Sequence, residues 1–317
     1  MGMSRKSLSL LGALAVAVMV AGCSSQPAPS SSSGGDDPAT VVFLNPQPTN
    51  PFWQRVEAGL KKAAEDAGYT LQVLGSGSDV GGQVNVMQSA VASHPDGIIV
   101  GALDSVGIVP GVEAANAANI PVIAVDSAIE GGDIASLIQT DNVAAAALAG
   151  NYIAENIDPG AKVLLVDGDL ATETANKRHD GAEQGLKEGG EFEIISQSGF
   201  WDTGKAMDVV QNALTANSDL AAIFNASDQM TAGTLAALGA RKGVVVTGFD
   251  GDPTILEEIM AGRVAADVAQ DPCTIGAESI SQMKLVLAGD KPEKLVAVDA
   301  VLITADNVDE FLGKDGC

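Results

Sequence analysis

Residues 40–68 read TVVFLNPQPTNPFWQRVEAGLKKAAEDAG, and the order of features in this stretch decides the fold. Val41–Leu44 is a continuous apolar run, which is typical of a strand buried on both faces of a parallel sheet. A polar loop follows. Asn50-Pro51 then opens a segment that carries its apolar residues on one stripe and ends at Gly68. A buried strand followed by an amphipathic helix is one unit of an α/β fold.

The same unit repeats along the rest of the chain. Further strands are predicted at Thr70–Leu74, Gly97–Gly101, Pro121–Val125, Lys162–Val166, Phe192–Gln197, Ala221–Phe224, Val244–Thr247 and Val264–Ala269. Helices are predicted between and after them at Gly82–Ser93, Val106–Ala118, Val143–Ile157, Ala175–Glu188, Lys205–Ala216, Gln229–Leu238, Pro253–Met260 and Cys273–Leu287. This alternation predicts an α/β fold of two doubly wound, parallel-sheet lobes.

The boundary between the two lobes is expected near residue 140, where one α/β series ends and a second begins. We expect an N-terminal lobe over residues 40–140 and a C-terminal lobe over residues 141–271. The last long helical pattern follows the second series, so the chain is expected to cross back. Residues 272–298 are then expected to complete the first lobe and residues 299–317 the second. The hinge would therefore consist of several passages of the chain between the lobes.

Composition excludes several classes of protein. The 317 residues include 17 Lys+Arg and 41 Asp+Glu, a formal net charge of −24, and so acidic a surface repels nucleic acid. A hydrophobic content of 46% is ample for a large core and excludes global disorder. Two His and three Cys leave almost no material for a zinc site, and neither a metal nor a cofactor is expected.

The first residues have the pattern of an export signal. Two basic residues precede the apolar run Leu8–Val20, which is short for a membrane span. The sequence VAGC at residues 20–23 is similar to a bacterial lipobox, so we expect a lipoprotein signal peptide over residues 1–22 and a lipid on Cys23. Residues 23–39 are rich in Ser, Pro and Gly, which predicts a flexible tether outside the cell membrane. A signal anchor with a chance cysteine is the alternative.

The remaining cysteines form an even pair. Once Cys23 carries a lipid, Cys273 and Cys317 are left in an oxidising compartment. We therefore expect a disulfide that ties Cys317 back to the body of the protein. Two free thiols are the alternative.

Polar and aromatic side chains gather directly after the predicted strands. Aromatic residues make up only 3% of the chain, yet both Trp and three of the seven Phe lie there: Phe52, Trp53, Phe200, Trp201 and Phe249. Doubly wound folds bind ligands at the carboxyl ends of their strands. Rings beside carboxylates, amides and one guanidinium suit a neutral polyhydroxylated ligand, because rings pack on C–H faces and polar groups bond hydroxyls.

Short motifs with a fixed order and spacing surround these positions. They are Asn50-Pro51-Phe52-Trp53, Pro121-Val122-Ile123-Ala124-Val125-Asp126, Asp141-Asn142, Arg178-x-x-Gly181, Asp228-Gln229-Met230, Gly248-Phe249-Asp250-Gly251 and Gln270. In this order they resemble the type I periplasmic sugar-binding proteins, the ribose/galactose-type solute receptors of ABC importers. The resemblance runs from Thr40 to the end of the chain and implies two lobes with a ligand cleft between them.

The resemblance also implies a role for each candidate residue. Five side chains would hydrogen-bond ligand hydroxyls: Asn50, Asp126, Arg178, Asp250 and Gln270. Four rings would sandwich the ligand: Phe52, Trp53, Trp201 and Phe249. Ser127 and Ser227 stand where ribose receptors carry an Arg and an Asn, which counts against ribose itself. A smaller or differently substituted sugar, or a sugar alcohol, is favoured.

Several of these residues also have a structural interpretation. Asn50 before a proline is a good helix N-cap. Asp126 and Asp250 could be turn residues after a strand, because Asp favours turns. Arg178 could be an exposed helical charge paired with a neighbouring acid, and Trp201 could cover a hydrophobic edge.

The function expected from these observations is ligand binding without catalysis. A lipid-anchored, two-lobe solute-binding protein would close around a small polyhydroxylated molecule and pass it to an ABC permease. We expect a monomer with no catalytic residues. The alternatives are a receptor for a furanose-like signal or a nucleoside, and a sensory protein that presents its closed form to a membrane kinase.

Overall fold

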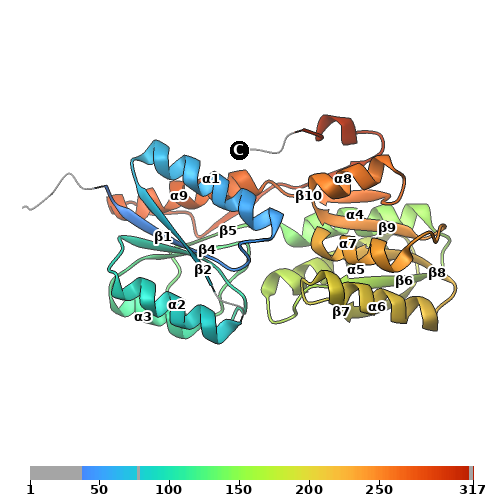
Figure 1. The fold of residues 1–317 in the computed structure, drawn as a ribbon, viewed down its shortest axis with the longest axis horizontal. Coiled ribbons are helices and arrows are strands. Elements are labelled where there is room, and N and C mark those ends of the chain that lie inside the picture. The colour runs from blue at the N-terminus through green and yellow to red at the C-terminus, as the bar shows by residue number, and fades with distance from the viewer. Residues whose placement is uncertain (1–37, 77–78, 314–316) are drawn as a thin grey trace, which may run out of the picture. The chain divides into compact units, whose positions relative to one another are not determined.

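The computed structural model describes residues 38–76, 79–313 and 317, and Figure 1 traces them as two sheets with helices packed on both. The expected signal peptide at residues 1–22, the lipidation site Cys23 and the tether up to residue 37 lie outside the described residues. Within the described part of the chain, no helix is long and apolar enough to cross a membrane.

The first sheet is parallel throughout. Its strand order is β11-β5-β4-β3-β1-β2. The strands are β1 (Thr40–Asn45), β2 (Thr70–Gly75), β3 (Gly97–Gly101), β4 (Val122–Val125), β5 (Ser136–Thr140) and β11 (Leu295–Val298). In β1, Val41 and Phe43 join one apolar cluster while Val42 and Leu44 join another, so the apolar run is buried on both faces.

Helices form those two apolar layers. α1 (Pro51–Ala67) and α9 (Pro272–Ala288) pack side by side on one face of the first sheet. α2 (Val80–Ala92) and α3 (Val109–Ala117) cover the other face (Figure 1). We call the first sheet with these four helices the first lobe.

The second sheet repeats the plan with one reversed edge strand. Its order is β12-β10-β9-β8-β6-β7, in which β12 runs antiparallel to β10. The strands are β6 (Lys162–Asp167), β7 (Glu193–Ser198), β8 (Leu220–Asn225), β9 (Val245–Asp250), β10 (Ala266–Ala269) and β12 (Val301–Thr304). The second lobe adds the helices α4 (Asn142–Asn156), α5 (Glu173–Gly189), α6 (Thr203–Ala216), α7 (Asp228–Leu238) and α8 (Pro253–Met260).

The chain passes between the sheets at three places within the described residues. It leaves the first sheet after β5, returns after β10 to form α9, and leaves again between β11 and β12. Residues far apart in the sequence therefore lie together where the sheets meet.

Sequence patterns miss three strands, β5, β11 and β12. Each has only four or five residues, and β11 and β12 lie at sheet edges with three of their four residues exposed or partly exposed. Their strand conformation depends on pairing with β5 and β10, which are distant in the sequence. A short run without a local partner carries too little signal to be read as a strand.

Helix starts differ from the expected ones by up to three residues, as at α3, which begins at Val109 rather than Val106. For three other helices an N-cap side chain decides the start. Asp79, Thr172 and Asp202 each accept a hydrogen bond from the backbone N–H three residues further on. Apolar periodicity locates a helix, whereas the cap defines its first residue.

A disulfide joins Cys273, near the start of α9, to Cys317, with the two Cα atoms 5.4 Å apart. The segment that ends at Cys317 follows the 3₁₀ helix η1 (Val308–Glu310), which packs near α8 of the second lobe. The bond therefore ties a segment that follows the second lobe to a helix of the first.

Candidate functional site

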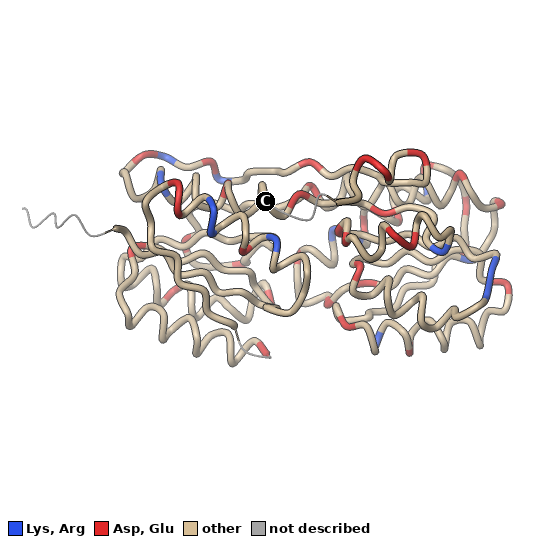
Figure 2. The backbone as a smooth tube through the Cα atoms, turned by 45° about the horizontal axis from the view of Figure 1, so that its top comes forward, with Lys and Arg blue, Asp and Glu red and all other residues tan. Residues whose placement is uncertain are grey.

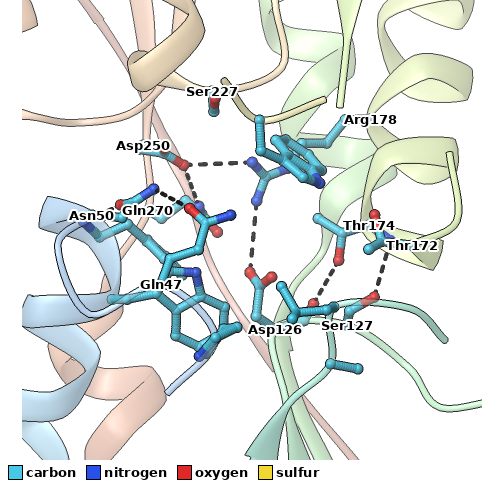
Figure 3. Close-up of a pocket in the computed structure, with 16 residues that line it drawn as sticks. Gln47, Asn50, Asp126, Ser127, Thr172, Thr174, Arg178, Ser227, Asp250 and Gln270 are labelled. Atoms are coloured by element: carbon cyan, nitrogen blue, oxygen red, sulfur yellow. Dashed lines mark hydrogen bonds and ion pairs between the residues drawn. The ribbon is translucent and has the colours of Figure 1, made fainter. Parts of the chain in front are cut away.

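The loops that follow the strands of both sheets meet around one cavity of about 60 Å³ (Figure 3). The first lobe supplies Pro46, Gln47, Asn50, Phe52, Trp53, Ala102, Leu103, Asp126 and Ser127 to its lining. The remaining lining residues are Thr172, Thr174, Arg178, Trp201, Ser227, Asp250 and Gln270. Every candidate ligand residue named from the sequence belongs to this lining except Phe249.

Arg178 on α5 is the central polar side chain of the cavity. The residue is 3% exposed, which rules out the alternative of a surface helical charge. Its Nε donates to Asn142 Oδ1 at 2.8 Å, and its Nη1 donates to the carbonyl oxygen of Ala226 at 2.8 Å. These two hydrogen bonds fix the plane of the guanidinium and leave Nη2 toward the cavity, where Asp126 lies (Figure 3).

Two carboxylates flank this guanidinium, one from each lobe. Asp250 Oδ1 lies 3.4 Å from Arg178 Nη1, and Asp126 Oδ1 lies 3.8 Å from Arg178 Nη2. The second distance is too long for a hydrogen bond. Asp126 Oδ1 is buried and has no hydrogen-bond partner among the described residues. A donor and an acceptor thus face one another across a gap that a polar atom could bridge.

Burial changes the protonation of both carboxylates. It raises the pKa of Asp126 to about 6, while Arg178 lowers that pKa and Glu173 raises it further. Burial also raises the pKa of Asp250 to about 7, although Arg178 and a hydrogen bond from Gln270 act in the opposite direction. Both groups therefore titrate close to neutral pH, and a bound hydrogen-bond donor would favour their ionised forms.

The backbone is strained at three lining residues. Asp126, Trp201 and Asp250 have φ values of 70°, 56° and 134°, a region that non-glycine residues rarely adopt. Strain of this kind is found where the surrounding structure holds a side chain in a required direction. Asp126 lies in a bend just after β4, as the structural interpretation expected, whereas Asp250 is the last residue of β9; both carboxylates line the cavity.

Each tryptophan packs on a glycine at the end of a strand. A Cβ added to Gly101, the last residue of β3, would lie 2.4 Å from an atom of the Trp53 ring. A Cβ added to Gly168, which follows β6, would lie 2.0 Å from the Trp201 ring. Both rings therefore need a glycine beneath them. Trp201 also packs against the core of the second lobe. Its ring therefore covers a hydrophobic edge and at the same time lines the cavity.

Phe249 is placed differently from the other candidate residues. It is fully buried, and the Arg178 guanidinium lies 3.9 Å from the centre of its ring. The sequence expectation was that Phe249 sandwiches the ligand. Instead, its ring lies behind Arg178, where it supports the guanidinium by a cation–π contact.

Amide side chains connect the loops around the cavity. Asn50 caps α1 by accepting from Phe52 N at 2.9 Å, and its Nδ2 donates across to Gln229 Oε1 in the second lobe at 2.8 Å. Gln270, at a crossing, donates from Nε2 to Asp250 Oδ1 at 2.7 Å and accepts from Thr140 Oγ1 at 2.6 Å. Asn50 is thus the helix cap of the structural interpretation and also a contact between the lobes.

Two serines of the first lobe accept hydrogen bonds from backbone N–H groups at the start of a helix in the second lobe. Ser105 Oγ accepts from Glu173 N at 3.0 Å, and Ser127 Oγ accepts from Thr174 N at 3.4 Å. Both N–H groups belong to the first turn of α5, which has no internal partners for them. Ser127 therefore has a partner in the other lobe, while Ser227 caps α7 through Met230 N at 3.4 Å.

Six lining residues were not named from the sequence: Pro46, Gln47, Ala102, Leu103, Thr172 and Thr174. Pro46 and Gln47 lie in the loop that carries Asn50, so position after a strand could have identified them. The two threonines lie at the start of α5, where Thr172 is an N-cap. Ala102 and Leu103 have no chemistry of their own that would distinguish them in a sequence.

The charges of the protein suit a neutral ligand better than an anion. Figure 2 shows acidic residues spread along the backbone of both lobes and few basic ones. Within the described residues, no group of three or more His, Cys, Asp or Glu side chains could hold a metal ion. Among the residues that the structure describes, Arg178 carries the one buried guanidinium, and it lies beside two carboxylates.

Comparison with known proteins identifies relatives over most of the chain. Residues 41–291 match the family described as periplasmic binding protein domain. The ribose import binding protein of Escherichia coli (strain K12) is 34% identical over 266 residues, which cover 83% of this chain and 90% of that protein. The D-allose-binding periplasmic protein of the same strain is 29% identical over 276 residues, 81% of this chain and 89% of that protein. The crystal structure of a Caulobacter myo-inositol binding protein bound to myo-inositol superimposes with a TM-score of 0.81 at 27% identity, covering 89% of this chain and 97% of that one.

Proposed function

Because the chain belongs to the periplasmic binding protein family, we propose that it binds a small neutral monosaccharide or sugar alcohol between its lobes and delivers it to an ABC importer. The relatives named above are binding proteins for ribose and D-allose, and the structural neighbour holds myo-inositol. Binding of this kind needs no covalent step, in keeping with a family of binding proteins rather than enzymes.

The observation that carries the proposal is the gap between Arg178 Nη2 and Asp126 Oδ1, 3.8 Å apart. A ligand hydroxyl that lies beside both atoms, about 2.8 Å from each, would accept a hydrogen bond from the guanidinium and donate one to the carboxylate. Asp126 Oδ1 would then gain the partner that it lacks among the described residues. A buried acceptor without a partner costs about 1–3 kcal/mol, so a hydroxyl donor is strongly favoured there. Sugars and polyols supply such hydroxyls beside apolar C–H faces, and Trp53 and Trp201 offer rings for those faces.

We propose that the ligand differs from ribose in its substitution. Two small side chains, Ser127 and Ser227, line the cavity, and each already has a partner at a helix start. Neither would offer the long reach of an Arg or the two functions of an Asn. A differently substituted sugar or a sugar alcohol fits these serines better.

Closure of the lobes around the ligand is part of the proposal. Hydrogen bonds link the lobes at Asn50–Gln229, Ser105–Glu173 and Ser127–Thr174. A ligand that contacts Asp126 of one lobe and Arg178 of the other would favour this arrangement over a separated one, because its contacts exist only there.

The N-terminal motif supports a proposal about where the protein acts, and the family supports one about its partner. We propose that Cys23 carries the lipid, that the tether holds the binding domain outside the cell membrane, and that a monomer meets an ABC permease there. A mass measurement of the protein purified from membranes, compared with Cys23→Ser, tests this anchor. An unmodified Cys23 on a membrane-bound protein would contradict it.

The first test of function is a thermal-shift screen of the domain from Thr40 against pentoses, hexoses, deoxysugars, sugar alcohols and nucleosides. A ligand at about 100 times its Kd stabilises the folded state by about 2.7 kcal/mol, which is readily detected. We expect one sugar or polyol to shift the melting temperature, and the shift to disappear in Asp126→Asn. Arg263→Ala, a change at an exposed position outside the cavity, is the control. A shift only with nucleosides would overturn the sugar assignment.

A further inference from the structure

Two buried aspartates, Asp228 and Asp267, lie directly behind the cavity beneath the end of β9. Asp228 is the first residue of α7, and Asp267 lies on β10. Both carboxyl groups face the backbone of Gly248: a Cβ placed there would lie 2.4 Å from Asp267 Oδ2 and 2.5 Å from Asp228 Oδ1. The two oxygens therefore lie close together over one glycine, which is the residue type that leaves room for them.

The pair holds the turn that carries Asp250. Asp228 Oδ1 accepts from Phe249 N at 3.2 Å and Asp228 Oδ2 accepts from Asp252 N at 2.7 Å. Asp267 Oδ1 accepts from Gly251 N at 3.0 Å. The residue enclosed by these contacts is Asp250, whose φ is 134° and whose Oδ2 accepts from Asp228 N at 3.3 Å. Hydrogen bonds to these two carboxyl groups therefore hold the backbone on both sides of Asp250.

One of the four carboxyl oxygens of this pair has no hydrogen-bond donor among the described residues. Asp267 Oδ2 is buried and receives no N–H or hydroxyl group from the described residues, while it faces Asp228 Oδ1 over Gly248. Two ionised carboxylates in this position would repel each other in a medium of low dielectric constant. A hydrogen bond between the two carboxyl groups requires a proton on one of them, and burial, the largest cause, raises the pKa of Asp228 far above its usual value and that of Asp267 to about 6.

We infer that Asp228 and Asp267 share one proton, and that this pair is a positioning device for the cavity carboxylate Asp250. The proton joins Asp267 Oδ2 to Asp228 Oδ1, while their other contacts hold the N–H groups of Phe249, Gly251 and Asp252. When the proton leaves, repulsion separates the carboxylates and releases the turn. Asp250 then loses the orientation in which it meets Arg178. Only the consequence for ligand affinity rests on the proposed function.

The charged groups around the pair set the direction of the pH effect. Asp250 and Asp252 face it from the turn, and the Arg178 guanidinium reaches it only through Asp250. Apart from that one arginine, all of these groups are acidic, so they hold the shared proton on the pair as the pH rises. The positioning is lost at alkaline pH, above the range in which Asp250 itself titrates.

Asp267→Asn is the decisive variant. Its amide oxygen would still accept from Gly251 N, and its NH₂ group would donate permanently to Asp228 Oδ1 in place of the proton. Asp267→Ala removes both contacts. Asp252→Asn is the matched control, because it removes a neighbouring charge while its side-chain oxygen can still cap α8 through Thr254 N.

The readout in the ligand-free protein is the NMR signal of the Arg178 Nε–H group, which is buried and donates to Asn142 Oδ1. In the wild type this signal should move at alkaline pH, as the pair loses its proton, and in Asp252→Asn it should make the same change at a lower pH, because one acidic neighbour is missing. In Asp267→Asn the signal should follow only the titration of Asp250, whose pKa burial raises to about 7, and should then stay unchanged at alkaline pH. A wild-type signal that does not move at alkaline pH, or an Asp267→Asn variant that follows the wild type through the same change, would overturn the inference even if Asp267→Ala fails to fold.

Binding is measured in parallel with D-ribose, D-allose and myo-inositol. For any of these that bind, Kd should rise about tenfold over the same pH interval in the wild type and less than about twofold in Asp267→Asn. Equal rises in the two proteins would contradict the role in positioning Asp250. Binding of none of the three would count against the sugar assignment, whereas the NMR result would still decide on the shared proton.

Discussion

At the scale of single residues, Arg178 shows how one side chain is fixed before any ligand is present. Its Nε donates to Asn142, its Nη1 donates to the carbonyl of Ala226 and lies beside Asp250, its face rests on Phe249, and its Nη2 is directed to the cavity. A planar fork with several donors is required for this, and an ammonium group cannot reproduce it.

Arg178→Lys should therefore reduce ligand affinity strongly. The lysine keeps the positive charge, but its ammonium group cannot donate hydrogen bonds to Asn142, Ala226 and the ligand at the same time. The ligand hydroxyl beside Asp126 would therefore lose its donor. We expect a loss of roughly 2–3 kcal/mol, about 30- to 150-fold in Kd, measured by calorimetry with the sugar found in the screen. Arg263→Lys, at a half-exposed position, should bind normally. Retained affinity in Arg178→Lys would remove this residue from the site.

Trp201→Ala should weaken binding by about 1–2 kcal/mol if its ring packs on the C–H face of the ligand. The matched control is Phe200→Ala, since Phe200 also has a positive φ but is 48% exposed and does not line the cavity. Gly168→Ala should resemble Trp201→Ala, because its Cβ would displace the indole ring. Equal affinity in all three variants would leave Trp201 with a packing role alone.

At the scale of elements, close helix contacts build each lobe. α1 and α9 approach so closely that a Cβ at Gly276 would lie 2.3 Å from the Val56 carbonyl oxygen. Backbone atoms cannot move aside as a flexible side chain can, so the two helices would have to separate. The contact matters for the site because the loop before α1 carries Asn50, Phe52 and Trp53 to the cavity.

Gly276→Ala should destabilise the protein by about 1–3 kcal/mol as measured by urea unfolding, although alanine favours helix formation. Gly81→Ala on α2 is the control, since its added Cβ would make only an ordinary contact, 3.4 Å from Asp79 Oδ1. That variant should be neutral or more stable by up to about 1 kcal/mol. A stable Gly276→Ala protein would mean that α1 and α9 can shift without loss of packing.

At the scale of the whole molecule, the protein carries buried acids beneath an acidic surface. The folded state raises the pKa of Asp126 to about 6 and that of Asp250 to about 7, from 3.8 in an exposed aspartate. The folded chain therefore binds more protons than the unfolded chain between these values. His179 acts in the same direction, because its hydrogen bond to Asp167 raises its pKa, and that contribution is lost as pH rises through the raised value.

The ligand-free protein should lose stability as pH rises from about 4 to about 7, contrary to the usual acid denaturation. The free energy of unfolding, measured by denaturant titration across this range, checks the sign. Repeating the series in about 1 M salt screens repulsion among exposed charges but leaves the buried carboxylates in place. Stability that increases with pH, or a decline that vanishes in salt, would mean that the buried acids do not control it.

The sequence by itself determined the α/β class, most strands and helices, and ten of the sixteen residues that line the cavity. Continuous apolar runs such as Val41–Leu44 and helix signals such as Asn50-Pro51 are local, so they can be read without the fold. The edge of a parallel sheet also collects the residues at the ends of its strands, which explains why Asp126 and Asp250 lie at the cavity, whereas Arg178 on α5 was a candidate because its motif resembles that of the sugar-binding family.

Only the tertiary structure decided what each of these side chains faces. Phe249 lies behind Arg178 and outside the cavity lining, Ser127 accepts a hydrogen bond from the start of a helix in the other lobe, and Asp267 faces Asp228 over Gly248. The short strands β5, β11 and β12 also depend on partners distant in the chain. The physical reason is common to all of them. A hydrogen bond, a ring contact or a strand pair depends on the distance and direction between two groups, and for groups far apart in sequence only the packing of the folded chain sets these.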